Sequence, residues 1–239
     1  MTHDIPIRGL LFDKDGTLFD FHRSWTSVFD EAARRLAHDD ETLTQVLMAA
    51  GGYDAHSGRI AAGSIFAAGD TQDLADAWFS HLAEWRNDDL VRWLDALFAE
   101  KGPLSAVPVT DLSLLLGALR KRGLTLGVAT NDSHASAMAA LERFGVTLHL
   151  SFCCGYDSGH GSKPGPGMVQ AFCRAMELDP SSVAVVGDNT HDLEMAKAAG
   201  AGLAIGALTG TSTRDDLAPL ADMVIDSIAV LPDTLERYL

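Results

Sequence analysis

Short apolar runs alternate with amphipathic segments along most of the chain. The runs are rich in Ile, Leu, Val and Ala and end at glycine or at polar residues, which is typical of buried parallel strands. They cover residues 5–12, 124–129, 183–187, 201–206 and 222–226. Segments with apolar residues at helical spacing lie around them, over residues 110–122, 133–144, 166–177 and 190–199. This alternation predicts an α/β fold, a Rossmann-like parallel sheet with helices on both faces.

The alternation is absent between the first and second of these runs. That region indicates helices only, over residues 25–37, 41–50, 70–85 and 88–100. It also contains all four tryptophans of the chain, as expected of a helical bundle with a small core of its own. We therefore predict a helical-bundle cap over residues 21–106, inserted after the first strand of an α/β core made of residues 1–20 and 107–239.

The composition is that of an ordinary globular protein, with 47% hydrophobic and 21% charged residues. No run approaches the ~18 apolar residues needed to span a bilayer, and we expect no targeting leader before residue 20. Three cysteines, of which Cys153 and Cys154 are adjacent, indicate a reducing compartment, so we expect a cytoplasmic protein. The net charge of −15 repels nucleic-acid phosphates and anionic lipids, and we expect neither nucleic acid nor a membrane as a partner.

Polar clusters follow three of the predicted strands. They are residues 13–17 (DKDGT), 130–132 (TND) and 187–192 (GDNTHD), and a glycine-rich loop, 160–165 (HGSKPG), lies between the last two. Ligands of open parallel sheets bind beyond the carboxyl ends of the strands, so we expect all four segments to converge at one edge of the sheet. The D-x-D-G-T pattern is the most specific of them, whereas G-D-x-x-x-D is weak when taken alone.

Each cluster also has a purely structural interpretation. The first could be a capped turn with solvated acids, and the last a pair of carboxylates at a helix N-terminus. Lys163 could be a surface lysine and Thr130 a helix cap. Their order along the chain and their common placement at strand ends favour a shared site.

In these motifs the chain resembles the haloacid-dehalogenase (HAD) superfamily, and in particular phosphoglycolate-phosphatase-like members that carry a helical cap after the first strand. The resemblance covers essentially the whole chain. The first motif matches at residues 12–18 (FDKDGTL), the second at Thr130, the third at Lys163 and the fourth at residues 187–192. The cap sequence matches such members in general character only.

The resemblance implies a role for each matching residue. Asp13 would be the nucleophile and Asp15 the general acid/base. The phosphate would be held by Thr130, Asn131 and Lys163. The cofactor would be Mg²⁺, bound at Asp13, Asp15, Asp188 and Asp192.

Elementary chemistry agrees with these roles. The Asp13 carboxylate, with an ordinary pKa of ~3.9, is ionised at pH 7 and needs no base to act as a nucleophile. Its obstacle is repulsion from the phosphate dianion, which Mg²⁺ and Lys163 would offset, so that an acidic protein can bind an anion. Asp15, with a pKa raised by its acidic neighbours, would protonate the leaving alkoxide and then take a proton from the attacking water.

We therefore predict a Mg²⁺-dependent phosphatase that acts on a small phosphorylated metabolite through a phospho-aspartyl intermediate, as a monomer or a homodimer. A sugar-phosphate mutase with the same core is the first alternative. A hydrolytic dehalogenase is less favoured, because the resemblance places an acid/base carboxylate at Asp15 that metal-free dehalogenases lack. A non-catalytic binding protein is disfavoured because a binder needs no acid/base.

The leading candidate for the substrate is 2-phosphoglycolate. A two-carbon phosphate offers few contacts, so its recognition calls for a cation that reaches its carboxylate from the cap. Arg59, in the loop-like stretch 51–63, is the first candidate for that cation, followed by His22, Arg23 and Arg86. A solvated loop arginine is the alternative interpretation of Arg59.

Overall fold

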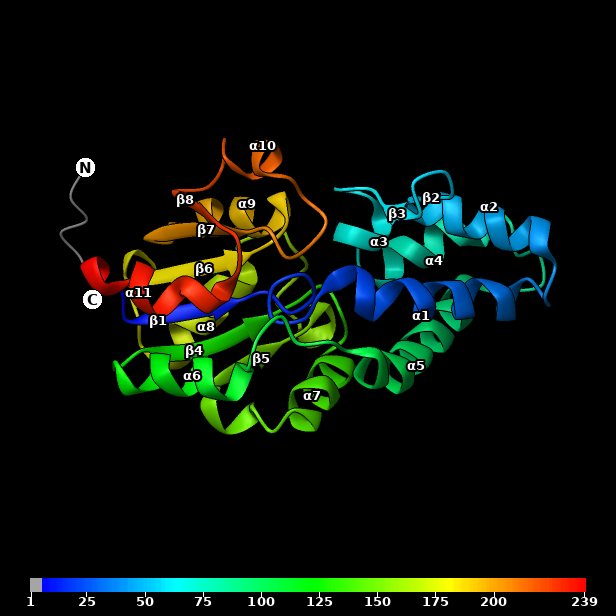
Figure 1. The fold of residues 1–239 in the computed structure, drawn as a ribbon. Helices are drawn as coiled ribbons and strands as arrows, with labels where there is room; N and C mark the ends of the chain where they lie inside the picture. The colour runs from blue at the N-terminus through cyan, green and yellow to red at the C-terminus, as the bar shows by residue number, and fades with distance from the viewer. Residues whose placement is uncertain (1–5) are drawn as a thin grey trace.

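The computed structural model describes residues 6–239 and contains one large parallel sheet (Figure 1). Within these residues the sheet has six strands in the order β5-β4-β1-β6-β7-β8. Their bounds are Gly9–Phe12 for β1, Thr125–Ala129 for β4, Phe152–Cys154 for β5, Val183–Gly187 for β6, Leu203–Ala207 for β7 and Met223–Ile225 for β8. All neighbouring strands pair in parallel. The predicted α/β class is confirmed.

Five of these strands coincide with the predicted apolar runs to within a few residues. The first run was predicted to begin at residue 5, which lies outside the described residues, and β1 itself begins at Gly9. The strand that the prediction omits is β5. It has three residues, too few to show a period, and it lies at the edge of the sheet, where Phe152 and Cys153 are only half-buried.

Helices cover both faces of the sheet. One face packs against α6 (Leu112–Lys121), α7 (His134–Arg143) and α11 (Leu231–Thr234), and the other against α8 (Gly167–Met176), α9 (Thr190–Ala199) and α10 (Arg214–Leu217). Within β1, Leu10 and Phe12 belong to the first of these cores and Leu11 to the second. The strand is apolar throughout because both of its faces are buried. Over residues 6–239, no helix has both the length and the apolar character needed to cross a membrane.

A second group of helices lies beyond the carboxyl ends of the strands (Figure 1). It comprises α1 (Phe21–Leu36), α2 (Glu41–Gly51), α3 (Ile65–Ala68), α4 (Thr71–Phe79) and α5 (Asn87–Ser105), together with the hairpin β2 (Tyr53–Asp54) and β3 (Arg59–Ile60). These elements share a core of their own, in which Trp78 is fully buried and donates from Nε1 to the carbonyl of Leu47 at 2.8 Å. We call this group of elements the cap.

The prediction that this region holds helices only is wrong at the hairpin. The hairpin has two residues in each strand, and Gly58 lies near its turn with φ +68°, so no strand-like alternation is long enough to register in the sequence. The predicted helix 70–85 is also too long, since α4 ends at Phe79. Leu82 and Trp85 continue the helical spacing from Trp78 and pack against the cap core, although the backbone there has left the helix.

Two chain segments join the cap to the sheet, and they run side by side. The amide of Asp20 donates to Val107 O at 2.8 Å, and the amide of Val109 donates to Leu18 O at 3.1 Å. In addition, α5 packs along α7 of the α/β core. The division into a core and a cap at residues 21 and 106 stays a prediction.

Candidate active site

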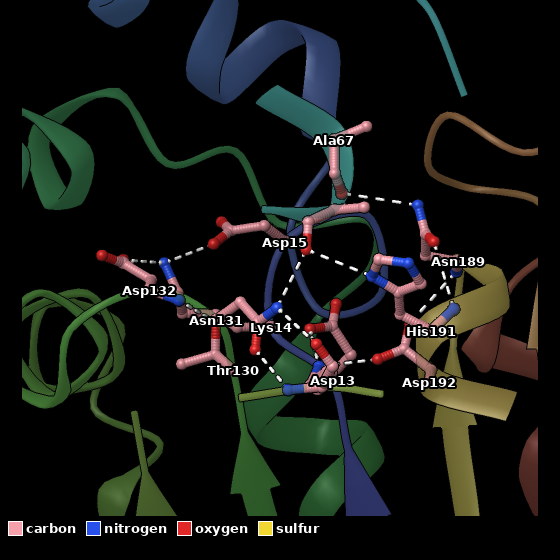
Figure 2. A network of polar contacts seen from close by, with 12 residues as sticks. Asp13, Lys14, Asp15, Ala67, Thr130, Asn131, Asp132, Asn189, His191 and Asp192 are labelled. Carbon is pink, nitrogen blue, oxygen red and sulfur yellow. Dashed lines mark hydrogen bonds and ion pairs between the residues drawn. The ribbon is translucent and has the colours of Figure 1, made fainter. Parts of the chain in front are cut away.

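The polar clusters meet because the strands that precede them are in register. Phe12 at the end of β1 lies opposite Val128 of β4 and Val186 of β6, so the residues that follow these strands emerge at one edge. The amide of Asp13 donates to Val186 O at 2.8 Å, which extends the ladder by one residue. Figure 2 shows these groups together beneath the α3 segment of the cap.

Three carboxylates form a buried group at this edge. Asp13, Asp188 and Asp192 each offer an oxygen within 4.8 Å of the others. Among residues 6–239, the one cation in contact with them is Lys163, whose Nζ lies 2.6 Å from Asp13 Oδ1 and 2.6 Å from Asp192 Oδ1. The second Asp13 oxygen, Oδ2, is buried and accepts no hydrogen bond from the described residues. The group therefore has more negative charge than one lysine offsets.

The pKa values of the carboxyl groups reflect this excess. The pKa of Asp13 is raised to about 7, chiefly because the carboxyl group is buried; the positive charge of Lys163 opposes this rise. Burial, followed by the charges of Asp13 and Asp192, raises the pKa of Asp188 well above its usual range. A divalent cation would relieve both effects. Carboxylate oxygens are the ligands that Mg²⁺ prefers, so the three residues and the unpartnered Oδ2 fit such an ion.

Two glycines allow the backbone to pass directly against Asp188. Gly16 has φ +92°, and a Cβ there would lie 2.4 Å from the carboxyl carbon of Asp188. A Cβ at Gly210, in the loop after β7, would lie 1.7 Å from Asp188 Oδ2. The amide of Thr211 donates to the same oxygen at 3.1 Å. The glycine of the D-x-D-G-T motif thus makes room for a carboxylate from another strand.

Asp15 lies outside the three-carboxylate group. Its Oδ2 lies 2.7 Å from Lys14 Nζ, which also lies 2.8 Å from Asp132 Oδ2 and 5.2 Å from the ring centroid of Trp25. Burial raises the pKa of Asp15, and Lys14 opposes that rise. Of its predicted roles, acid/base catalysis suits this position, whereas its side chain is not among the carboxylates gathered for a metal.

Lys14 is the residue that sequence reasoning missed. It is 2% exposed, and although burial disfavours its charge, Asp132 and Asp15 together raise its pKa above the usual lysine value. The signal available in the sequence was a lysine placed between two acids at the end of a buried strand. Its second partner, Asp132, follows a different strand, so no local pattern links the two.

Thr130 and Asn131 follow β4 and differ in what their side chains do. Thr130 is buried, and its Oγ1 accepts from the amide of Asp132 at 3.0 Å. The Asn131 side chain bridges the core and the cap: Oδ1 accepts from the amide of Lys163 at 2.9 Å, and Nδ2 donates to Ala68 O at 2.8 Å. The contact of Asn131 with phosphate stays a prediction.

The cap meets the core at the C-terminal end of α3. Besides Asn131, the side chain of Asn189 donates to Ala67 O at 3.4 Å, and His191 Nδ1 lies 3.4 Å from Ala68 O (Figure 2). The next residue of the cap with such a contact, Asp70, accepts from Ser162 Oγ at 2.6 Å. The α3–α4 junction is therefore held over the strand ends by core side chains from three different loops.

A cavity of about 90 Å³ lies between this junction and the strand ends. Seven predicted site residues of the core line it: Asp13, Asp15, Thr130, Asn131, Lys163, Asp188 and Asp192. Arg59 does not line it. That arginine is exposed in β3, with Nη2 at 3.4 Å from His22 Nε2, and its predicted contact with substrate has no support in this geometry.

Comparison with known proteins places the chain in a family. The model of the haloacid dehalogenase-like hydrolase family matches residues 7–200. The chain therefore belongs to that family of hydrolases, which confirms the resemblance seen in its motifs.

Individual relatives cover nearly the whole chain. "Probable phosphatase IndB" of Dickeya dadantii is 33% identical over 90% of this chain and 87% of its own length. The phosphoglycolate phosphatase of Rhodospirillum rubrum is 30% identical over 95% of this chain and 90% of its own. A predicted phosphoglycolate phosphatase from Haemophilus somnus has the same fold, with a TM-score of 0.71 at 19% identity, over 99% of this chain and all (100%) of that one.

Proposed function

We propose that this protein is a Mg²⁺-dependent phosphatase that hydrolyses a small phosphorylated metabolite through an aspartyl-phosphate on Asp13. The observation that carries the proposal is the position of Asp13 Oδ2. This oxygen is buried and has no hydrogen-bond partner among the described residues, and Asp13 lines the cavity together with Lys163, Asp188 and Asp192. The phosphatase names of the two relatives at 33% and 30% identity support the same activity.

Asp13, Asp188 and Asp192 are the residues that would hold Mg²⁺. The ion, when bound, offsets the repulsion between these carboxylates and the phosphate and polarises the phosphoryl oxygens. On the protein side, Lys163 supplies the fixed positive charge, and Thr130, which lines the cavity, would donate its hydroxyl to a phosphoryl oxygen.

The covalent steps use Asp13 and Asp15. A carboxylate oxygen of Asp13 attacks phosphorus, and the bond to the ester oxygen breaks as Asp15 gives that oxygen a proton. Water then attacks the phosphorus of the acyl phosphate while Asp15 takes one of its protons, which releases phosphate and restores Asp13. The contact between Lys14 and Asp15 holds the acid/base side chain at the cavity wall during both steps.

We further propose that residues 21–106 act as a cap that keeps bulk water from the aspartyl-phosphate. The separate core of this region and the hydrogen bonds from Asn131, Asn189 and His191 to α3 support this role. Because 2-phosphoglycolate is the predicted substrate and the Rhodospirillum rubrum relative carries that name, it belongs among the substrates to be tested.

The test is phosphate release from a panel of phosphomonoesters, with Mg²⁺ and with excess chelator. We expect turnover with Mg²⁺ only, poor replacement by Ca²⁺ (which takes more ligands at longer distances), and acid-stable protein-bound phosphate in single-turnover samples. Release of phosphate separates a phosphatase from a mutase, which would return an isomeric sugar phosphate. Full turnover in chelator, or labelled Asp13→Asn protein, would contradict the proposal.

A further inference from the structure

The cap wall of the cavity is made of large apolar side chains. Six of them come from four different helices: Phe21, Trp25, Phe29, Phe66, Leu74 and Phe98. They are packed against one another, with Phe29 and Phe66 stacked at a centroid distance of 4.0 Å and Phe29 and Phe98 edge to face at 5.7 Å. The part of a substrate that extends from the phosphate towards the cap therefore meets a fixed aromatic surface.

The same wall offers no positive charge. Among the described residues that line the cavity, the only lysine is Lys163 and there is no arginine. Lys163 is already engaged, at 2.6 Å from both Asp13 and Asp192. His191 also lines the cavity, but it lies on the core side and contacts the carbonyl of Ala68.

The cap instead contributes a carboxylate to the wall. Asp70 lines the cavity at the start of α4, where it caps the helix through the amide of Asp73 and accepts from Ser162. A substrate carboxylate that approached Asp70, Asp15 and Asp132 would lose hydration and meet three carboxylates, of which Asp15 and Asp132 share the single ammonium group of Lys14. Like charges so close together in a buried site repel strongly.

We propose that the enzyme prefers phosphomonoesters whose alcohol part is uncharged and apolar over those whose alcohol part carries a carboxylate. This inference rests on the proposed phosphatase function and narrows its substrate class. It predicts that 2-phosphoglycolate is a poor substrate, because recognition of its carboxylate would require a cation that the cap wall does not provide.

The charge component is measured with 2-phosphoglycolate and its amide, 2-phosphoglycolamide. The two have almost the same shape and similar leaving groups, so they differ chiefly in one negative charge. We expect kcat/KM for the amide to be at least about tenfold higher. Benzyl phosphate measures the apolar component, because its leaving group is also an alkyl alcohol but carries an aromatic ring. We expect kcat/KM for benzyl phosphate to be higher than that for the amide. Equal values, or a preference for 2-phosphoglycolate, would overturn the inference.

A variant tests the origin of the preference. Asp70→Asn removes the cap carboxylate while asparagine still caps the helix and still contacts Ser162. We expect the amide-to-carboxylate ratio of kcat/KM to fall by about threefold or more, because one repulsive charge is gone. Asp88→Asn, an exposed acid in the first turn of α5, is the matched control and should leave the ratio unchanged. An unchanged ratio in Asp70→Asn as well would show that the cap carboxylate does not set it.

Measurements of binding distinguish a failure of this inference from a failure of the proposed function. Affinities of the three compounds for Asp13→Asn protein with Mg²⁺, measured by calorimetry, do not depend on turnover. If the wild-type protein does not release phosphate through Asp13, but the amide and benzyl phosphate still bind more tightly than 2-phosphoglycolate, the substrate preference stands and the proposed function is wrong. If turnover requires Asp13 but 2-phosphoglycolate binds best, the preference falls alone. Absence of both binding and turnover would overturn both.

Discussion

The two walls of the cavity differ in chemistry and in how the chain builds them. The core wall holds ionisable groups, and each follows a strand or a loop at the edge of one sheet, as Asp13 follows β1 and Asp188 follows β6. The cap wall is mostly apolar and takes its side chains from four helices. We infer that the core wall performs a reaction common to all substrates, whereas the cap wall distinguishes between them. Substitutions in the core should then affect every substrate alike, and substitutions in the cap should change substrate ratios.

The largest effect is expected from Asp13→Asn. Asparagine is nearly isosteric with aspartate but a far poorer nucleophile, so turnover of every substrate should fall by about 10³-fold or more. Phosphate release and thermal unfolding are the measurements, and the melting temperature should stay close to that of the wild type. Asp215→Asn, at an exposed position of α10, is the control. If a preparation free of deamidated protein kept more than a few per cent of wild-type turnover, the assignment of Asp13 as the nucleophile would be wrong.

Lys163→Met should produce the next largest effect. Methionine keeps the length of the side chain but leaves Asp13 and Asp192 without their cation, so we expect kcat to fall by about 10²- to 10³-fold. The loss should be the same for benzyl phosphate and 2-phosphoglycolamide. A loss that differs several-fold between them would show that the core wall also selects substrates, and near-ultraviolet circular dichroism would check the fold.

Phe66→Leu probes the cap wall with a smaller change. Leucine preserves apolar contact but removes the aromatic face that stacks on Phe29. We expect kcat/KM for benzyl phosphate to fall by about two- to tenfold, with little change for 2-phosphoglycolamide. Phe79→Leu, at a position that is 43% exposed on α4, should change neither value. Parallel losses on both substrates would contradict a selective role for this wall.

The smallest effect concerns the junction between the walls. Asn131→Ala removes the hydrogen bonds to the amide of Lys163 and to Ala68 O, so α3 is held less firmly over the site. We expect KM to rise by about two- to fivefold for all substrates alike, and kcat to change less. Steady-state kinetics would measure this, with Asn87→Ala on α5 as the control. A fall in kcat alone would assign Asn131 to the chemistry instead.

The core wall was largely predictable from the sequence, and its charged contacts were not. Apolar runs that end in D-x-D-G-T, T-N-D and G-D-x-x-x-D predict strand ends at one edge, because parallel strands share a direction. Whether a given side chain faces the cavity depends on register and on loops. Lys14 and Asp132 meet only because β1 and β4 pair side by side, and Gly210 reaches Asp188 from a third loop.

The cap wall was not predictable, for a different reason. Its aromatic residues have the spacing of buried helix positions, and the same side chains form the cap core and line the cavity. No sequence pattern distinguishes an aromatic residue that only packs in the cap core from one that also lines the cavity. Arg59 was predicted as the cap cation for a substrate carboxylate because it lies in a loop-like stretch of the cap, but the hairpin places it beside His22, and it does not line the cavity.

The position of β1 in the sheet has a consequence for how the chain folds. This strand is the first of the sheet to be synthesised, yet it pairs on both sides with strands made much later, Gly9 opposite Thr125 and Gly9 opposite Val183. Until those segments leave the ribosome, the sequence GLLF has no native partner on either edge. The cap helices between them share a core of their own and can pack before β4 is made, which shortens the loop that β1 and β4 must close. Nascent chains that have not yet exposed β6 should therefore be the species most prone to aggregate.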